Sequence, residues 1–254
     1  MSFWEFSGPD GGYADANGVA IGEDFSIYVA DTRNDTVRRF TPFGKQVETI
    51  GDRPDRGPGA ACRDRKGVLD RPRALAFFGD VLLVGCGERM LVRGVQRFGR
   101  DGTCLPPLRS CGDPEGRFGA PWGISAGPRG IFVADTLRGA IQRFTTEGRF
   151  VSEFSTAASA DEASRPVAVA SLGGGDLLVL DRGDRAGLVR FSIDGEVRGG
   201  LAESLIDLDE VCGLATDSLD RVYILDRDGE RVQRLTPGLE FDVLIADLQE
   251  MLDE

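Results

Sequence analysis

Three unlike side chains stand at the start of short segments rich in small residues, and they are the strongest candidates for chemistry. Asn17, Arg73 and Trp122 each directly precede such a segment. Arg71 and Arg165 lie just before two of these segments and would extend the patch. Guanidinium groups bind carboxylates in paired hydrogen bonds, and tryptophan and arginine are frequent interface anchors. The combination suits an anionic or peptide ligand, with interior packing as the alternative role of Trp122.

A recurring aspartate has a different interpretation. Asp31, Asp135, Asp181 and Asp226 each end an apolar strand and begin a polar turn, and Cys86 takes this place in a further copy. A carboxylate at such a point accepts hydrogen bonds from backbone N–H groups. A catalytic or metal-binding acid would be unique, whereas these recur, so we interpret them as structural caps. A metal or acid–base site is the alternative.

The composition excludes several kinds of chemistry. The chain has no histidine among its 254 residues, which removes Ser-His-Asp triads, Cys-His dyads and histidine-bound metals. A net charge of −12 and an isoelectric point near 4.6 argue against nucleic-acid and membrane partners. The beginning, MSFWEFSGPD, has no basic and no apolar region of a secretory signal. We therefore expect a cytoplasmic protein.

These candidates belong to a unit that occurs five times. In each unit an apolar strand ends in Asp or Cys, a turn follows, and a second strand ends in Arg-Phe or a close variant of it. The copies are IYVADTRNDTVRRF (27–40), LLVGCGERMLVRGVQRF (82–98), IFVADTLRGAIQRF (131–144), LLVLDRGDRAGLVRF (177–191) and VYILDRDGERVQRL (222–235). A strand of small residues precedes each copy, and another strand follows the copies after a tight turn. In four copies this turn has a glycine four residues past the Phe.

Four strands in up-and-down order, repeated every 40–50 residues or so, are typical of a β-propeller. We therefore predict an all-β fold of four-stranded blades. Five blades are favoured because five units are found, and six blades are the alternative. The small-residue strand would be the innermost of each blade, so the turn after each Asp would open on the same face as Asn17, Arg73 and Trp122.

The blades resemble NHL repeats. The resemblance is carried by the run GDPEGRFGAPWGI (112–124), by GPDGGYADANGV (8–19), and by VADT followed by a turn and a VxxF-like strand. It covers nearly all of residues 3–240. Cys86 departs from the pattern, and the family's turn asparagine occurs only as Asn34. Six blades are common in this family.

The resemblance also carries expectations about activity. The similar peptidyl-hydroxyglycine lyases hold zinc with histidines, which this chain lacks. Gluconolactonase-type propellers hold calcium with Glu, Asn and Asp in the channel, and here only Asn17 hints at such a site. We therefore expect no cofactor, with calcium as the alternative. The predicted function is a non-catalytic scaffold that binds a protein or peptide through its top face. A metal-dependent propeller hydrolase or lyase acting on a small molecule is the alternative.

The two ends of the chain carry predictions of their own. Phe3–Ser7 reads as a lone fourth strand that would complete the last blade and close the ring within one domain, 1–240. Apolar residues at 241, 244, 245, 248 and 252 have helical spacing, which predicts a helical tail over 241–254. The alternative is a strand at 241–245 in an incomplete ring that dimerises. The predicted oligomeric state is therefore either a monomer or a homodimer. The basic loop 51–70 is either a lid or docking arm, or a disordered insertion.

Overall fold

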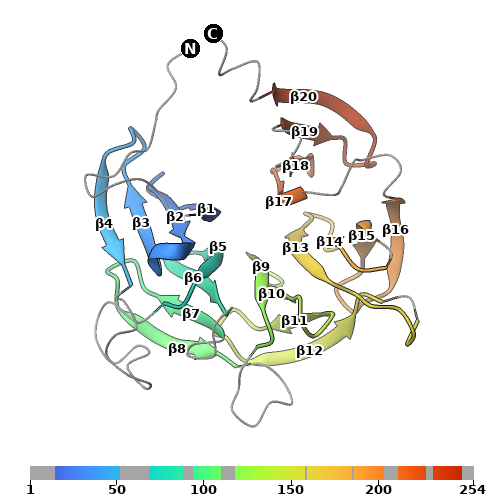
Figure 1. Cartoon of the computed structure of the whole chain (residues 1–254), viewed down its shortest axis with the longest axis horizontal. Helices are drawn as coiled ribbons and strands as arrows, with labels where there is room; N and C mark the ends of the chain where they lie inside the picture. Colours follow the sequence, from blue (N-terminus) through green and yellow to red (C-terminus); the bar gives the residue numbers. More distant parts are fainter. Residues whose placement is uncertain are drawn as a thin grey trace.

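Five antiparallel sheets of four strands each are arranged around a central axis (Figure 1). The computed structural model describes residues 15–51, 69–87, 94–109, 118–157, 159–184, 186–202, 211–226 and 231–247. In every sheet the strands pair in sequence order, so each repeat forms one blade. The predicted five-bladed β-propeller is confirmed.

Each blade runs from an inner strand at the axis to an outer strand at the rim. Blade 1 comprises β1 (Ala16–Ile21), β2 (Ile27–Asp31), β3 (Thr36–Phe40) and β4 (Gln46–Ile50), with the 3-10 helix η1 (Thr32–Asn34) after β2. Blade 2 comprises β5 (Pro72–Phe78), β6 (Val81–Cys86), β7 (Gly94–Phe98) and β8 (Cys104–Leu108). Blade 3 comprises β9 (Pro121–Gly127), β10 (Gly130–Asp135), β11 (Ala140–Phe144) and β12 (Phe150–Ser155). Blade 4 comprises β13 (Pro166–Ser171), β14 (Leu177–Asp181), β15 (Gly187–Phe191) and β16 (Val197–Ala202). Blade 5 comprises β17 (Val211–Thr216), β18 (Val222–Asp226), β19 (Arg231–Leu235) and β20 (Phe241–Asp247).

Blade 5 corrects the prediction for the C-terminal segment. Residues 241–247 form the outer strand β20, so the helix predicted over 241–254 is wrong for this part. The hairpin before β20 has the hydrogen bonds of the other blades: Thr236 N–H donates to the Glu240 carbonyl at 2.8 Å, as Thr41 N–H does to Lys45. Leu239 stands where the other blades have glycine and has φ 66. Because leucine rarely adopts a positive φ, the sequence lacks the glycine that predicts this hairpin in the other blades.

Because β20 is the fourth strand of blade 5, the place predicted for Phe3–Ser7 in that sheet is already taken. Phe3–Ser7 itself lies outside the described residues, as do 248–254 and most of the basic loop 51–70.

The core lies between blades rather than inside them. Four clusters of buried side chains each join one blade to the next. Between blades 1 and 2, for example, Tyr28 and Val37 pack with Leu75 and Val84. Burial of each such side chain stabilises the fold by about 1.5–3 kcal/mol. The blades therefore hold one another in place around the axis.

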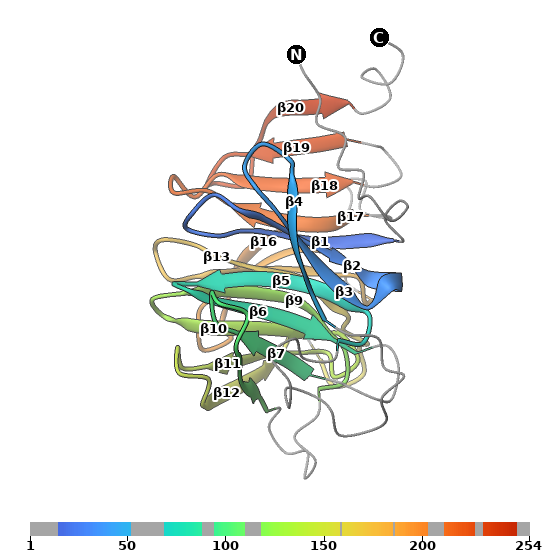
Figure 2. The same cartoon turned by 90° about the vertical axis from the view of Figure 1, so that its left-hand side faces the viewer.

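The two faces of the ring differ. In the side view, η1 lies at the edge opposite the hairpins that join first and second strands (Figure 2). Inner strands begin and second strands end on the η1 face, as the pairing of Ala16 with Asp31 shows. We call this the mouth face, because the predicted site residues stand there. No helix among the described residues is long and apolar enough to cross a membrane.

Candidate functional site

A β-bulge opens every blade at the mouth face. In blade 1 the register passes from Ala16 opposite Asp31 to Gly18 opposite Ala30, so Asn17 has no partner in β2. The same shift leaves out one residue in each of the other inner strands. These residues are Arg73, Trp122, Val167 and Cys212. A bulge re-aims the side chain of its extra residue, and bulges are frequent beside functional sites. The bulge residue is the position that varies most among the five repeats, and the fold places its five copies in a ring around the axis.

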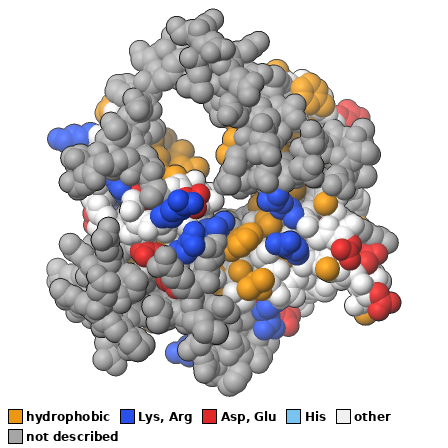
Figure 3. Space-filling view, viewed as in Figure 1, with side chains coloured by type: hydrophobic (Ala, Val, Ile, Leu, Met, Phe, Trp, Pro, Cys, Tyr) orange, Lys and Arg blue, Asp and Glu red, His pale blue; other side chains and the backbone are white. Residues whose placement is uncertain are grey.

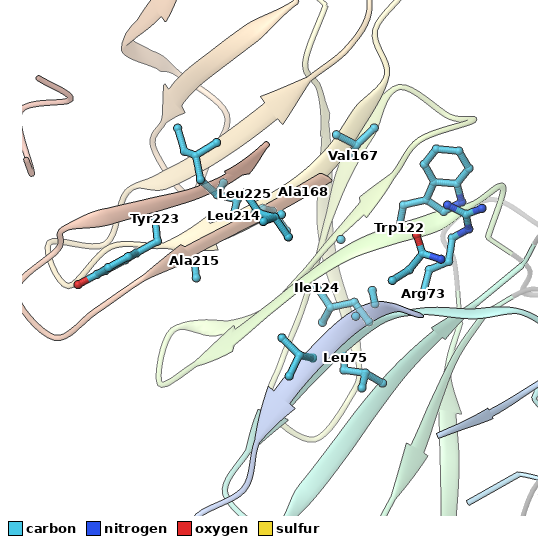
Figure 4. Close-up of a pocket in the computed structure, with 18 of the residues that line it drawn as sticks. Arg73, Leu75, Trp122, Ile124, Val167, Ala168, Leu214, Ala215, Tyr223 and Leu225 are labelled. Atoms are coloured by element: carbon cyan, nitrogen blue, oxygen red, sulfur yellow. The ribbon is translucent and has the colours of Figure 1, made fainter. Parts of the chain in front are cut away.

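Arg73 and Trp122, the bulge residues of blades 2 and 3, are in contact. The guanidinium carbon of Arg73 lies 4.6 Å from the centroid of the Trp122 ring (Figure 4). A cation over an indole face at this distance is a favourable contact of about 0.5–2 kcal/mol. The indole N–H of Trp122 is buried and has no hydrogen-bond acceptor within the described part of the chain. An indole donor and a cation are therefore held side by side.

A cavity of about 270 Å³ lies at the inner strands, lined by residues of all five blades. Asn17, Arg73, Trp122 and Val167 contribute to its wall together with Tyr223. The rest of the described lining consists of small and branched apolar residues, and Arg73 is the one charged side chain in it. Lys and Arg side chains gather near the centre of this face (Figure 3). A single cation in an apolar wall suits a ligand with one negative group and an apolar body.

Close contact between inner strands fixes the cavity floor. A Cβ on Gly18 would lie 2.1 Å from the Arg73 carbonyl oxygen, and one on Gly123 would lie 2.7 Å from the Ala168 Cα. Only glycine fits at such separations, so these positions let neighbouring strands touch. The glycines therefore set the distance between the bulge residues of neighbouring blades.

Asn17 is tied into the frame of blade 1. Its amide nitrogen donates to the Asp15 carbonyl at 2.9 Å and to Thr32 Oγ1 at 3.0 Å. Thr32 in turn donates to the Pro72 carbonyl at 2.7 Å. The first strand of blade 2 is thus coupled to the orientation of Asn17. This arrangement positions a side chain at the cavity wall.

Arg71 and Arg165 lie at the mouth face but outside the cavity lining. The Arg71 guanidinium lies 3.9 Å from the Asp15 carboxylate, and Arg165 is exposed. Their backbone N–H groups donate to Asp35 and Asp181, each at 2.8 Å. The structure thus brings together Asn17, Arg73 and Trp122, and leaves these two arginines at the rim.

Two of the recurring aspartates, Asp135 and Asp181, cap backbone N–H groups. Asp135 is fully buried and accepts the N–H groups of Gly119 and Ala120 at 2.9 and 2.8 Å. Burial raises the pKa of Asp135, and these two hydrogen bonds oppose the rise. Asp181 accepts from Arg165 and from Gly183 in the same way. The interpretation of these two residues as caps is confirmed.

Asp31 is held differently. It pairs with the Arg38 guanidinium at 2.6 Å and accepts from the Asn34 amide at 2.8 Å.

The side chains of the described cavity wall suit ligand binding. Within the described residues, no three His, Cys, Asp or Glu side chains are grouped to hold a metal ion. Cys86 is buried, and burial raises the pKa of its thiol to about 12, which makes it a poor nucleophile. What the described wall presents is a guanidinium, an indole, an amide and apolar surface. Such a wall can bind an anionic group and an apolar group side by side.

Comparisons with known proteins support the fold. No protein-family profile matches the chain, and no curated protein matches it in sequence. Solved structures do match. A virginiamycin B lyase from Staphylococcus aureus is 15% identical with a TM-score of 0.62, and the match covers 90% of this chain and 69% of the lyase. A chain of the nidogen/laminin complex is 16% identical with a TM-score of 0.64, covering 91% of this chain and 78% of that one.

A gluconolactonase from Xanthomonas campestris is 14% identical with a TM-score of 0.64, covering 90% of this chain and 75% of the enzyme. At these identities the likeness shows the β-propeller fold alone. The neighbours include enzymes as well as a protein-binding propeller. The NHL resemblance rests on the motifs of the sequence.

Two features of the site are not among the sequence-based predictions. Tyr223, Leu225 and Val232 of blade 5 line the cavity from its side, although their strands are second and third in the blade. No described strand lies between these three residues and the cavity. The second feature is the bulge, which has a signal in the sequence: its extra residue is followed by Gly or Ala in every copy.

Proposed function

We propose that the protein is a non-catalytic propeller scaffold that binds a protein or peptide partner through its mouth face. The contact between Arg73 and Trp122 at the wall of an apolar cavity carries this proposal. Arginine and tryptophan are the residue types that most often dominate binding energy at interfaces. The partner would place a carboxylate at Arg73 and an apolar side chain in the cavity.

The net charge of the protein adds specificity to this site. The chain carries a formal charge of −12, so an acidic partner is repelled everywhere except near a local cation. Arg73 is such a cation. Binding would therefore require the acidic group to align with the channel mouth. We also propose a cytoplasmic protein that acts without nucleic acid or membrane, as a monomer or homodimer.

The alternative is a metal-dependent hydrolase or lyase acting on a small molecule in the channel. Two of the structural neighbours are enzymes, a lyase and a gluconolactonase. The described cavity wall, however, contains no carboxylate side chain. This wall favours the scaffold, because calcium prefers several carboxylate and carbonyl oxygens.

A random phage-displayed peptide library tests the proposal. Selection on the wild-type protein should enrich peptides with Asp or Glu close to an aromatic or branched apolar residue. Their affinities, measured by titration calorimetry, should fall about 10-fold or more in Arg73→Glu and in Trp122→Ala, since both remove an anchor. Arg129→Glu provides a matched control, because Arg129 is an exposed arginine at the opposite hairpin face.

Equal binding by wild-type and Arg73→Glu proteins would contradict the proposal. So would a selection that yields no Arg73-dependent peptide. Saturable binding of Ca²⁺ or Zn²⁺ that is lost in Asn17→Ala would favour the enzyme instead.

A further inference from the structure

A second cavity lies between blades 3 and 4 on the hairpin face, opposite the mouth face. It has a volume of about 200 Å³ and shares no described lining residue with the mouth-face cavity. Phe132 and Leu177, each 1% exposed, form its floor. Its wall includes Pro128, Ser171 and Ile193, which are exposed or half-buried, so a small molecule can reach them. A mostly apolar concavity with few polar groups is typical of a ligand site.

The equivalent place between blades 1 and 2 holds an aromatic ring. By strand register, Phe132 corresponds to Tyr28, and Ser171 corresponds to Phe77. The Tyr28 and Phe77 rings meet edge to face, with centroids 4.9 Å apart and planes inclined by 65°. Because serine is much smaller than phenylalanine, blades 3 and 4 leave space where blades 1 and 2 pack a ring.

Two glycines at the same point of the repeat measure this difference. A Cβ on Gly22 of blade 1 would lie 3.5 Å from Tyr28 Cε2 and 3.8 Å from Phe77 Cζ. Gly127 takes the same place in blade 3 and lines the cavity. A Cβ on Gly127 would meet no atom of the described chain within 4 Å. The Phe77 ring thus has no counterpart among the described side chains of blades 3 and 4.

Arg129 supplies the one charged side chain of the described lining. Its guanidinium lies against the next blade, since a Cβ on Gly175 would be 2.5 Å from the Arg129 Cζ. Gly175 has φ 99, so glycine is required there on two grounds. Within the described part of the chain, the Arg129 guanidinium makes no hydrogen bond and no ion pair. A guanidinium in this situation can bind a ligand carboxylate through paired hydrogen bonds.

Two carboxylates of the neighbouring hairpins have partners of their own. Asp194 pairs with the Arg143 guanidinium at 3.6 Å. Asp220 accepts the Gly173 N–H at 2.6 Å. Arg129 is therefore left as the cation at the edge of an apolar cavity.

We propose that this cavity binds a small aromatic carboxylate of the size of benzoate. The ring would lie between the hairpins, where blade 2 places the Phe77 ring, and the carboxylate would pair with Arg129. An apolar cavity of about 150 Å³ can hold benzene, so the volume here accommodates one ring with its carboxylate. The cavity is too small for a peptide. Its ligand is therefore distinct from the mouth-face partner, and the two proposals stand or fall separately.

Fluorine NMR of para-fluorobenzoate tests the site in the intact protein. We expect saturable binding that is about 10-fold weaker in Arg129→Gln, because hydrogen bonds to a charged group are lost. The neutral para-fluorobenzamide should bind the wild type about 10-fold more weakly than the carboxylate, and Arg129→Gln should not weaken it further. Arg73→Gln is the matched control, because Arg73 lines the mouth-face cavity.

A second variant fills the cavity with the side chains of blade 2. Ser125 Oγ lies 2.8 Å from Ser171 Oγ, and the equivalent residues of blade 2 are Ala76 and Phe77. Ser125→Ala combined with Ser171→Phe should therefore abolish binding of para-fluorobenzoate. Its urea unfolding curve shows whether it folds, and the exposed Arg129→Gln tests the site where it does not.

The backbone amide signals of Gly127, Gly173 and Gly175 should shift on titration, which locates the ligand. Equal affinity of the wild type and Arg129→Gln would overturn the proposal, as would full binding by a folded Ser125→Ala/Ser171→Phe protein. Loss of binding in Arg73→Gln with retention in Arg129→Gln would place the carboxylate at the mouth face and overturn it too. Absence of saturable binding would have the same consequence.

Discussion

Asp35 accepts the backbone N–H of Arg71 at 2.8 Å across the boundary between blades 1 and 2. In blade 4 the equivalent N–H, that of Arg165, bonds to Asp181 of its own blade. Blade 2 has Cys86 at the place of that aspartate. The preceding blade therefore supplies the acceptor that blade 2 has lost. Asp35 of blade 1 thus compensates for Cys86 of blade 2, and the segment that leads into β5 keeps a hydrogen bond at Arg71.

Loss of the Asp35 carboxylate should weaken this boundary. Asp35 has φ 56, so Asp35→Gly removes the acceptor without imposing a side chain on a left-handed backbone. We expect a loss of about 1–3 kcal/mol in the free energy of unfolding, measured in urea. Asp35→Asn keeps an acceptor oxygen and suits this conformation, so it should cost clearly less. Equal losses in the two variants would show that the hydrogen bond to Arg71 is not the cause.

Two threonines link blades through buried hydrogen bonds of the same design. Thr32 donates to the Pro72 carbonyl and Thr136 to the Pro166 carbonyl, both at 2.7 Å. Thr32→Val and Thr136→Val should each cost about 1–3 kcal/mol in urea unfolding, since a buried carbonyl loses its donor. Thr32→Val should cost more, because Thr32 also accepts from Asn17. The exposed Thr103→Val is the control. A cost no larger than that of the control would refute the role of these bonds.

The repeat made the blades predictable. The strand ending in Asp135 and the strand ending in Phe144 have counterparts in all five copies, at similar spacing. A unit that recurs in this way predicts the same pairing in each copy, as β10 and β11 show. The site was predicted in part for the same reason. Asn17, Arg73 and Trp122 stood out because they differ at one position of a repeat that otherwise agrees.

Features that depend on contacts with other strands or blades could not be predicted from the sequence of one repeat. Leu239 takes a conformation that normally favours glycine, and local propensity therefore pointed away from the hairpin that tertiary pairing with β19 enforces. The role of Asp35 depends on Arg71, which is 36 residues away in the chain. Exposure of Val19 depends on what lies beside blade 1, and no local pattern contains that information.

Acid should weaken the hairpin face of blade 1. The pKa of Asp24 is lowered to about 2, chiefly by the backbone N–H of Ser26 at 3.0 Å and further by the Arg39 guanidinium at 2.8 Å. A folded pKa below the unfolded value of 3.8 stabilises the protein above about pH 4, and this stabilisation is lost as the pH falls toward 2. We expect the difference in urea midpoint between wild type and Asp24→Asn to shrink over this range.

Glu196→Gln removes an exposed carboxylate from another hairpin and serves as the control for charge loss. A difference between wild type and Asp24→Asn that stays constant from pH 6 to pH 2 would contradict the assignment.

The buried thiol of Cys86 should be inert in the folded protein. Burial raises its pKa to about 12, so at pH 8 only about one molecule in 10,000 carries the reactive thiolate, and no reagent reaches it without opening the core. Iodoacetamide followed by mass spectrometry should modify the partly exposed Cys104 first and Cys86 only as urea unfolds the chain. Since Cys86 lies in the cluster shared by blades 1 and 2, its alkylation reports separation of these blades. Rapid modification of Cys86 in the native state would mean that blades 1 and 2 part readily, contrary to the packing described above.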